Sequence, residues 1–121
     1  MSRVLVAKSA GFCFGVSRTV RIAEEELKKG ECYSIGPVIH NDSVVSSLDE
    51  EGLHVLKSEQ DVLPGSRVLI RSHGISETEE DTLRRLGAEI IDATCPNVSK
   101  IHKIVAKASD SGRQVIVIGK K

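Results

Sequence analysis

Short β-branched runs alternate along the chain with longer stretches whose apolar residues recur at helical spacing, and this alternation constrains the fold more than any other feature. The runs that predict strands cover residues 3–7, 33–35, 53–56, 68–70, 90–91 and 114–118. The stretches that predict helices cover residues 16–27, 42–51, 76–86 and 98–108. Strands that alternate with helices form βαβ units with right-handed crossovers. We therefore expect an α/β fold with a mainly parallel sheet.

Composition excludes several functional classes. At 121 residues the chain fits one compact domain, or part of a larger core. A hydrophobic share of 40% and a charged share of 28% argue against a disordered tail and a membrane span. Seventeen basic and seventeen acidic residues cancel, and only two phenylalanines and one tyrosine are available for stacking, so we expect no nucleic-acid and no membrane partner. The first apolar run ends at Lys8, too early for a signal peptide, which predicts the cytoplasm.

Four residues with useful chemistry follow predicted strands and precede predicted helices. They are Cys13, His40, His73 and Cys95. In a parallel sheet every such loop emerges at the carboxyl edge, where helix N-termini favour anions. We therefore expect these side chains to gather at one edge.

The cysteines at this edge suggest a metal or cluster site. Pro96 fits the first position of a helix, which puts Cys95 at the N-cap, where a thiolate is favoured. Cys13 lies between two glycines that permit close approach of a bulky ligand. Zinc normally needs four ligands in paired spacing, whereas iron-sulfur clusters tolerate scattered cysteines. Two buried structural thiols are the alternative. We expect Cys32, which precedes a strand, to be structural and to lie at the opposite edge.

The histidines divide in the same way. His40 and His73 lie in loops at the predicted edge and can donate hydrogen bonds to phosphate oxygens. A lone loop histidine is more often a plain surface residue, but two at one edge favour a binding site. His54, in a short strand, and His102, in mid-helix, are expected to be structural.

Four motifs occur in order and carry a resemblance to a known family. They are Gly-Phe-Cys-Phe-Gly-Val at 11–16, Val-Ile-His-Asn at 38–41, Ser-His-Gly at 72–74 and Asp-Ala-Thr-Cys-Pro at 92–96. Together they resemble the 4-hydroxy-3-methylbut-2-enyl diphosphate reductases, iron-sulfur enzymes that end the methylerythritol phosphate route to isoprenoids. The resemblance covers essentially the whole chain.

The resemblance implies roles for individual residues. Cys13 and Cys95 match two of the three cysteines that bind a [4Fe-4S] cluster, and His40 and His73 match histidines around the substrate diphosphate. Val16 and Val98 match apolar positions near the hydrocarbon part of the substrate. The implied reaction is a reductive dehydroxylation that gives isopentenyl and dimethylallyl diphosphate. Its implied electron donor is a ferredoxin- or flavodoxin-like protein.

The family pattern continues past Lys121, with a proton-donating acid, a third cysteine and further substrate contacts. We therefore expect an N-terminal fragment that is inactive alone. By the resemblance, residues 1–13 are an N-terminal strand and cluster loop, 14–96 a first α/β domain, and 97–121 the opening helix and strand of a second domain. Some apolar surface should then be exposed. A non-catalytic α/β module that binds phosphate or a cluster is the alternative function, and a plain structural domain is the third.

Overall fold

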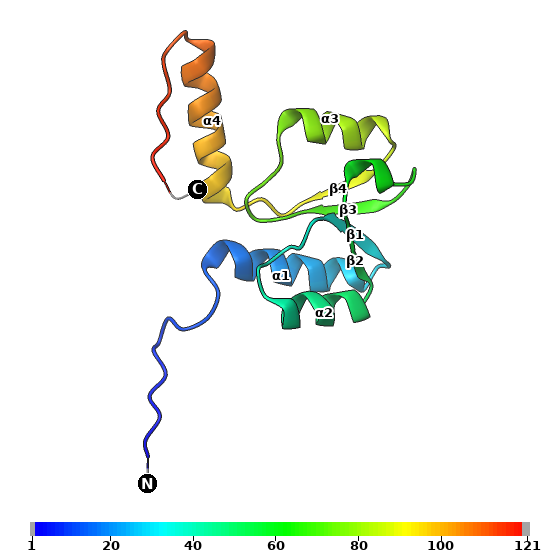
Figure 1. Ribbon diagram of the computed structural model, residues 1–121, viewed down its shortest axis with the longest axis vertical. Helices are drawn as coiled ribbons and strands as arrows, with labels where there is room; N and C mark the ends of the chain where they lie inside the picture. The colour runs from blue at the N-terminus through cyan, green and yellow to red at the C-terminus, as the bar shows by residue number, and fades with distance from the viewer. Residues whose placement is uncertain (1, 120–121) are drawn as a thin grey trace.

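The computed structural model describes residues 2–119 and confirms the predicted α/β architecture (Figure 1). The elements in order are α1 (Phe14–Leu27), β1 (Cys32–Ile35), α2 (Asp42–Glu50), β2 (Leu53–Leu56), the 3-10 turn η1 (Glu59–Asp61), β3 (Arg67–Ile70), α3 (Glu77–Arg85), β4 (Glu89–Asp92) and α4 (Pro96–Asp110). The sheet has four strands in the order β2-β1-β3-β4, and every neighbouring pair is parallel. Its strand-to-helix loops therefore open at one edge, as the sequence predicts.

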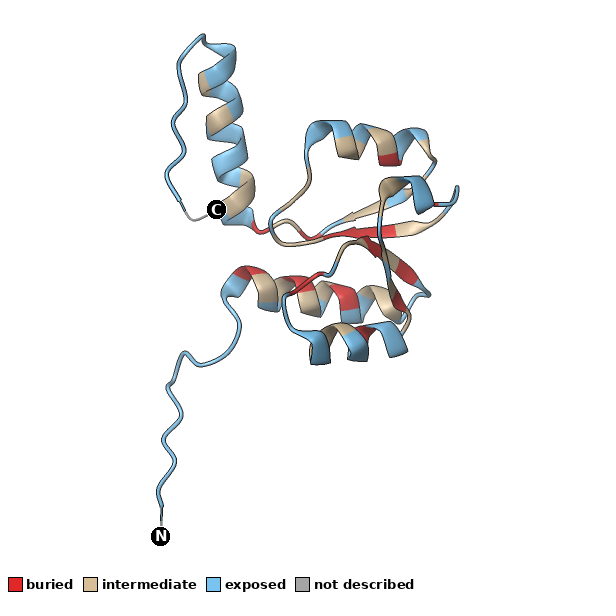
Figure 2. Ribbon diagram, in the orientation of Figure 1, coloured by how far each residue is buried: buried red, intermediate tan, exposed pale blue. Residues whose placement is uncertain are grey.

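Helices cover both faces of the sheet. In Figure 1, α1 and α2 lie against one face and α3 lies against the other. Leu69 of the interior strand β3 belongs to the first core, with Ala23 of α1 and Leu48 of α2. Val68, its neighbour, belongs to the second core with Leu83 of α3. Because successive strand residues face opposite sides, β3 is buried on both faces, and Figure 2 shows buried residues along the strands and on α1.

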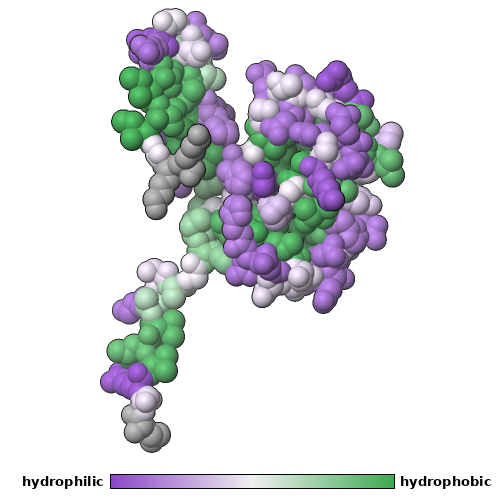
Figure 3. Space-filling view, in the orientation of Figure 1, coloured by the Kyte–Doolittle hydropathy of each residue, from purple (hydrophilic) through white to green (hydrophobic). Residues whose placement is uncertain are grey.

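The strands expected at the two ends of the chain are not formed. Residues 3–7 and 114–118 have no strand pairing. Val4, Leu5 and Val6 are 77–84% exposed, and Ile118 is 94% exposed. A β-branched run becomes a strand only where a neighbouring edge offers hydrogen bonds, and neither run reaches the sheet. Figure 3 shows the first run as an apolar stretch standing away from the body, which agrees with the expected exposure of apolar surface.

α4 is attached to the sheet only through its N-terminal end. The helix has no buried residue, and Ile101 and Ile104 are more than half exposed. Figure 1 shows it extending away from the strands together with the segment that follows it. The sheet therefore positions the start of α4, where Cys95 lies. Within residues 2–119 no helix is long and apolar enough to cross a membrane.

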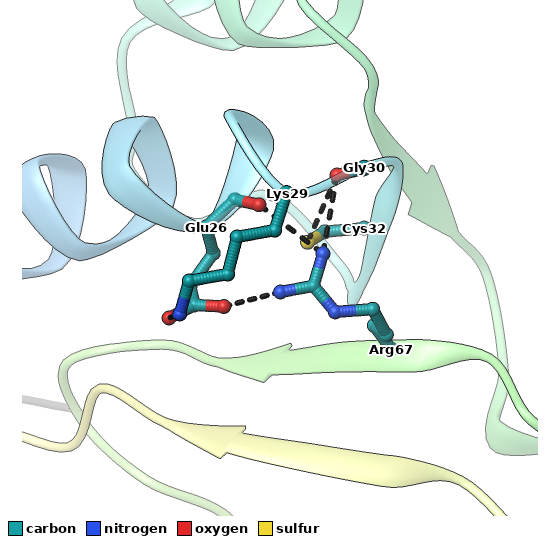
Figure 4. Close-up of polar contacts among 5 residues, drawn as sticks. All are labelled: Glu26, Lys29, Gly30, Cys32 and Arg67. Atoms are coloured by element: carbon teal, nitrogen blue, oxygen red, sulfur yellow. Dashed lines mark hydrogen bonds and ion pairs between the residues drawn. The ribbon is translucent and has the colours of Figure 1, made fainter.

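At the amino edge of the sheet, one arginine joins three elements (Figure 4). Nη1 of Arg67 donates to the backbone oxygens of Glu26, at 3.1 Å, and Gly30, at 3.2 Å. Its Nη2 forms an ion pair with the Glu26 carboxylate, which also accepts from Lys29 at 2.7 Å. These contacts tie the end of α1 to the starts of β1 and β3. The same cluster surrounds Cys32, whose Sγ lies 3.8 Å from the Gly30 oxygen.

Candidate functional site at the carboxyl edge of the sheet

Both predicted ligand cysteines occupy helix N-caps. Cys13 caps α1 and is exposed, although the strand expected before it is missing. Cys95 caps α4, with Pro96 in the first turn as predicted, and is only 7% exposed. Neither thiol makes a side-chain cap hydrogen bond. Both sulfurs are therefore uncommitted at the positive ends of helices.

The start of α1 lies directly against Cys95. A Cβ built on Gly15 would stand 2.9 Å from both Cβ and Sγ of Cys95, closer than any side chain tolerates. Only glycine permits this approach, which explains the glycine two residues after Cys13. The start of α1, two residues after Cys13, is thus packed against Cys95, and the convergence of all four predicted side chains stays a prediction.

Hydrogen bonds fix the segment before Cys95. The hydroxyl of Thr19, a buried residue of α1, donates to the Ala93 oxygen at 3.1 Å. Arg18 Nη1 donates to the Thr94 oxygen at 3.1 Å. The amide of Cys95 donates to the Ser72 oxygen at 2.8 Å. The loop of His73 and the N-terminus of α1 therefore both hold Cys95 in place.

His40 and His73 are exposed residues in the loops after β1 and β3. His40 precedes Asn41, whose side chain caps α2 by accepting from the Val44 amide at 3.2 Å. Partial desolvation of its ring lowers the pKa of His73, and the charges of Arg71 and His40 lower this pKa further. Arg71 lies two residues before His73, and its Nη1 donates to the Pro37 oxygen in the loop of His40, which links the two loops. A neutral His73 ring there keeps one N–H for a phosphate oxygen.

Val16 and Val98 lie in the first turns of the two cysteine-capped helices and are half-buried. Val16 packs against the core, so only part of its side chain remains available. The contact of Val16 and Val98 with the hydrocarbon part of the substrate stays a prediction.

Cys32, His54 and His102, which were expected to be structural, contact neighbouring parts of the fold. Cys32 is 1% exposed at the start of β1, opposite Cys13 and Cys95, and burial raises the pKa of its thiol. His54 lies in β2, with Nδ1 at 2.9 Å from an Asp49 oxygen. His102 supports the edge more closely than expected, since a Cβ on Gly74 would lie 3.1 Å from its Cε1. Its ring therefore packs beside the loop of His73.

Two arginines at this edge have no motif that would have singled them out. Arg18 is one cation on an amphipathic helix, and Arg71 is one cation after a buried strand. The usable signal for Arg71 was its place between the strand and His73. A residue directly after an inner parallel strand lies at the carboxyl edge of the sheet, where ligands bind in such folds.

The cysteines at this edge fit part of an iron-sulfur cluster site. Such clusters are held by thiolates, and two cysteines at this edge carry thiols that make no side-chain cap hydrogen bond. Residues 2–119 hold no group of three histidine, cysteine or acidic side chains arranged around a metal position. The edge therefore fits as a partial site that supplies two thiolate ligands.

Comparison with known proteins identifies the family. The model of the LytB protein family matches residues 4–121. The chain belongs to this family. Among curated LytB-type relatives, the 4-hydroxy-3-methylbut-2-enyl diphosphate reductase of Caldanaerobacter subterraneus subsp. tengcongensis is 44% identical over 98% of this chain. The reductase of Aquifex aeolicus is 42% identical over the whole of it.

Solved structures agree with the LytB assignment. A structure of (E)-4-hydroxy-3-methyl-but-2-enyl diphosphate reductase superposes with a TM-score of 0.84, at 41% identity over 97% of this chain. The E-1-hydroxy-2-methyl-but-2-enyl-4-diphosphate reductase of Plasmodium falciparum gives 0.80, at 35% identity over 86% of the chain. The chain spans 42–43% of the length of the two curated relatives.

Proposed function

We propose that this chain contributes the N-terminal portion of a reductase that converts 4-hydroxy-3-methylbut-2-enyl diphosphate to isopentenyl and dimethylallyl diphosphate. Family membership and the names of the relatives support this reaction class. The observation that carries the proposal is the close approach of Gly15, two residues after the N-cap Cys13, to the N-cap Cys95. Arbitrary buried cysteines need no such arrangement.

In this proposal, Cys13 and Cys95 supply two thiolate ligands of a [4Fe-4S] cluster. When bound, the cluster would supply electrons and a Lewis-acidic iron for the loss of the substrate hydroxyl as water. The N-termini of α1 and α4 favour the negative charge of the thiolates. Glycine at position 15 keeps the two ligands close, while the Cys95 amide remains bonded to the Ser72 oxygen.

The diphosphate would be held by the neighbouring loops. His40 and His73 donate hydrogen bonds to its oxygens, and the N-terminus of α2 adds free backbone amides beside His40. Val16 and Val98 would line the hydrocarbon portion from the first turns of α1 and α4. The substrate is thereby oriented with its charged end on the loops and its apolar end between two helices.

The proposed function also implies a division of the chain into domains. Residues 14–96 form the first domain, 1–13 carry the cluster loop, and residues from 97 onward open a second domain. α4 has no buried residue, which supports this division, because a helix with exposed isoleucines needs a partner surface. Reducing equivalents would come from a ferredoxin- or flavodoxin-like donor. Unpaired thiols and such a donor favour the cytoplasm.

A chimera tests the proposal. Residues 1–121 would replace the matching segment of the Aquifex aeolicus relative, with the unmodified relative as the positive control. After anaerobic iron-sulfur reconstitution, we expect cluster absorbance and substrate reduction. Both should be lost in Cys13→Ser and Cys95→Ser and kept in Cys32→Ser. A chimera without a cluster, or one that loses it only in Cys32→Ser, would overturn the proposal.

A further inference from the structure

Arg71 joins the two loops that carry His40 and His73. It directly follows β3 and lies two residues before His73. Its Nη1 donates to the Pro37 oxygen at 3.3 Å. A Cβ on Gly36, where φ is +70°, would lie 3.1 Å from the same nitrogen. The guanidinium therefore lies against the backbone of the loop after β1 while its own backbone belongs to the loop after β3.

This position is poorly satisfied in the chain as described. The Nε of Arg71 is buried and has no hydrogen-bond partner within residues 2–119. A buried donor without a partner carries a desolvation penalty and calls for an explanation. Arg67, at the other end of the same strand, bonds two backbone oxygens and a carboxylate. An arginine placed for stability alone would resemble Arg67.

The positive charge of Arg71 also affects the candidate site. Besides the desolvation of the ring, the charges of Arg71 and His40 lower the pKa of His73. Arg71 also contributes to the lowered pKa of the Glu79 carboxylate at the start of α3. A fixed cation between two histidine loops favours an anion bound there. A planar guanidinium lying on a peptide backbone also restricts how far the two loops can separate.

We propose that Arg71 is a positioning residue that clamps the loop of His40 to the loop of His73 at the separation a diphosphate requires. The clamp acts through the planar guanidinium on Pro37 and Gly36, and the histidines make the contacts to the ligand. This inference rests on the proposed function, since it specifies how the phosphate end of that site is built.

Substitutions of Arg71 by lysine and methionine distinguish a role in holding the two loops together from a role of the positive charge alone. Lysine keeps the positive charge but lacks the planar fork that lies along the loop backbone. Methionine removes both charge and hydrogen bond at similar length. Arg67→Met is the matched control, because it removes an arginine from the other end of β3 without touching the histidine loops. His54→Gln is a second control in β2, in case Arg67→Met lowers the folded fraction.

The test uses the 121-residue chain and inorganic pyrophosphate as the probe. Histidine ring resonances are followed by NMR during titration, and an amide spectrum verifies that each variant is folded. We expect pyrophosphate to move the signals of His40 and His73 in the wild type. Affinity should fall about tenfold in Arg71→Met and about threefold in Arg71→Lys, and it should stay within about twofold in both controls. The pKa of His73 should also rise in Arg71→Met.

The possible results are distinguishable. Unchanged affinity in Arg71→Met would overturn the clamp while leaving the proposed function in place. Wild-type affinity in Arg71→Lys, with a loss in Arg71→Met, would reduce the role to charge and also overturn the clamp. An equal loss in folded Arg67→Met or His54→Gln would make the effect a general consequence of loosening the fold. A wild-type chain whose His40 and His73 signals ignore pyrophosphate would contradict the proposed phosphate site itself.

Discussion

The amino and carboxyl edges of the sheet differ in how their polar side chains are hydrogen-bonded. At the amino edge, Arg67 bonds the Glu26 and Gly30 oxygens and pairs with the Glu26 carboxylate, and Cys32 is buried beside them. At the carboxyl edge, the exposed Cys13 makes no side-chain cap hydrogen bond, and the Nε of Arg71 has no hydrogen-bond partner among residues 2–119. Polar groups are satisfied at the first edge and left available at the second.

This contrast separates stability from binding within one small sheet. A parallel sheet sends its strand-to-helix loops to one edge, so ligand-binding groups can accumulate there without disturbing the packed elements. The amino edge, where helices end and strands begin, is free to be closed by hydrogen bonds. Unsatisfied groups at functional sites are offset by such closure elsewhere in the fold.

The largest expected difference between the edges is thiol reactivity. With iodoacetamide, Cys13 should be alkylated at least about 100-fold faster than Cys32, because it is exposed whereas Cys32 is 1% exposed with a raised thiol pKa. Cys95, at 7% exposure, should react at an intermediate rate. Peptide mass spectrometry over a time course measures the three rates. In urea the rates should converge, and equal rates in the folded chain would remove the contrast.

The next effect is on folding stability. Arg67→Met removes two hydrogen bonds to backbone oxygens of about 1 kcal/mol each, so the free energy of unfolding should fall by about 2 kcal/mol, or about 30-fold in the equilibrium. Arg71→Met should cost less than about 1 kcal/mol, because one hydrogen bond is lost and one unsatisfied donor is removed. Urea denaturation measures both. A larger loss in Arg71→Met would mean that both edges stabilise the fold alike.

A smaller effect should follow from Gly15→Ala. The added Cβ would meet Cys95 at 2.9 Å, and overpacking costs about 1–3 kcal/mol, partly offset by the better helix propensity of alanine. We expect a net loss of about 1 kcal/mol, or about fivefold in the folding equilibrium. Cys95 should also be alkylated faster, because α1 and α4 must separate at their N-termini.

Gly119→Ala is the matched control for this substitution. A Cβ at position 119 meets no atom within 4 Å, so stability and the Cys95 rate should both stay at wild-type values. If Gly15→Ala behaved in the same way, the close approach of the two cysteine-capped helices would not be a feature of the folded chain. Urea denaturation and alkylation of one preparation give both readouts.

Much of the fold follows from sequence, and the misses have physical causes. The inner strands were predicted because 68–70 and its neighbours are flanked by helical stretches and turn residues, and these local signals agree with the packing. The runs at 3–7 and 114–118 have the same composition but no adjacent strand edge, and composition alone carries no information about neighbours.

The candidate site divides similarly. Topology predicts the edge for Cys13 and Cys95 without any knowledge of distance, because each precedes a helix. The contact of Cys95 with Gly15 and the reach of Arg71 to Pro37 depend on how loops far apart in sequence pack together. The place of Arg71 directly after a buried strand predicts the edge at which it lies, but not that its guanidinium reaches the Pro37 oxygen.

The smallest expected effect is a pH dependence of folding stability, to which His54 in β2 and His73 at the carboxyl edge contribute with opposite sign. A hydrogen bond that His54 donates to the Asp49 carboxylate raises the pKa of His54 above 6.5, so its stabilisation is present below pH 6.5 and is lost as pH rises through the raised value. Desolvation lowers the pKa of His73 below 6.5, so folding is favoured above pH 6.5 and that advantage is lost as pH falls. The two contributions together predict a shallow stability maximum near pH 6.5.

Single substitutions separate the two contributions. In His73→Gln only the fall of stability above pH 6.5 should remain, and in His54→Gln only the fall below it, and each fall should be small because both rings are in contact with solvent. Thermal unfolding between pH 5.5 and pH 8, bracketing the ordinary value of about 6.5, measures both slopes. Slopes of the same sign would show that His73 gains a favourable partner on folding, as His54 does, and that the histidines at the carboxyl edge are already satisfied without a ligand.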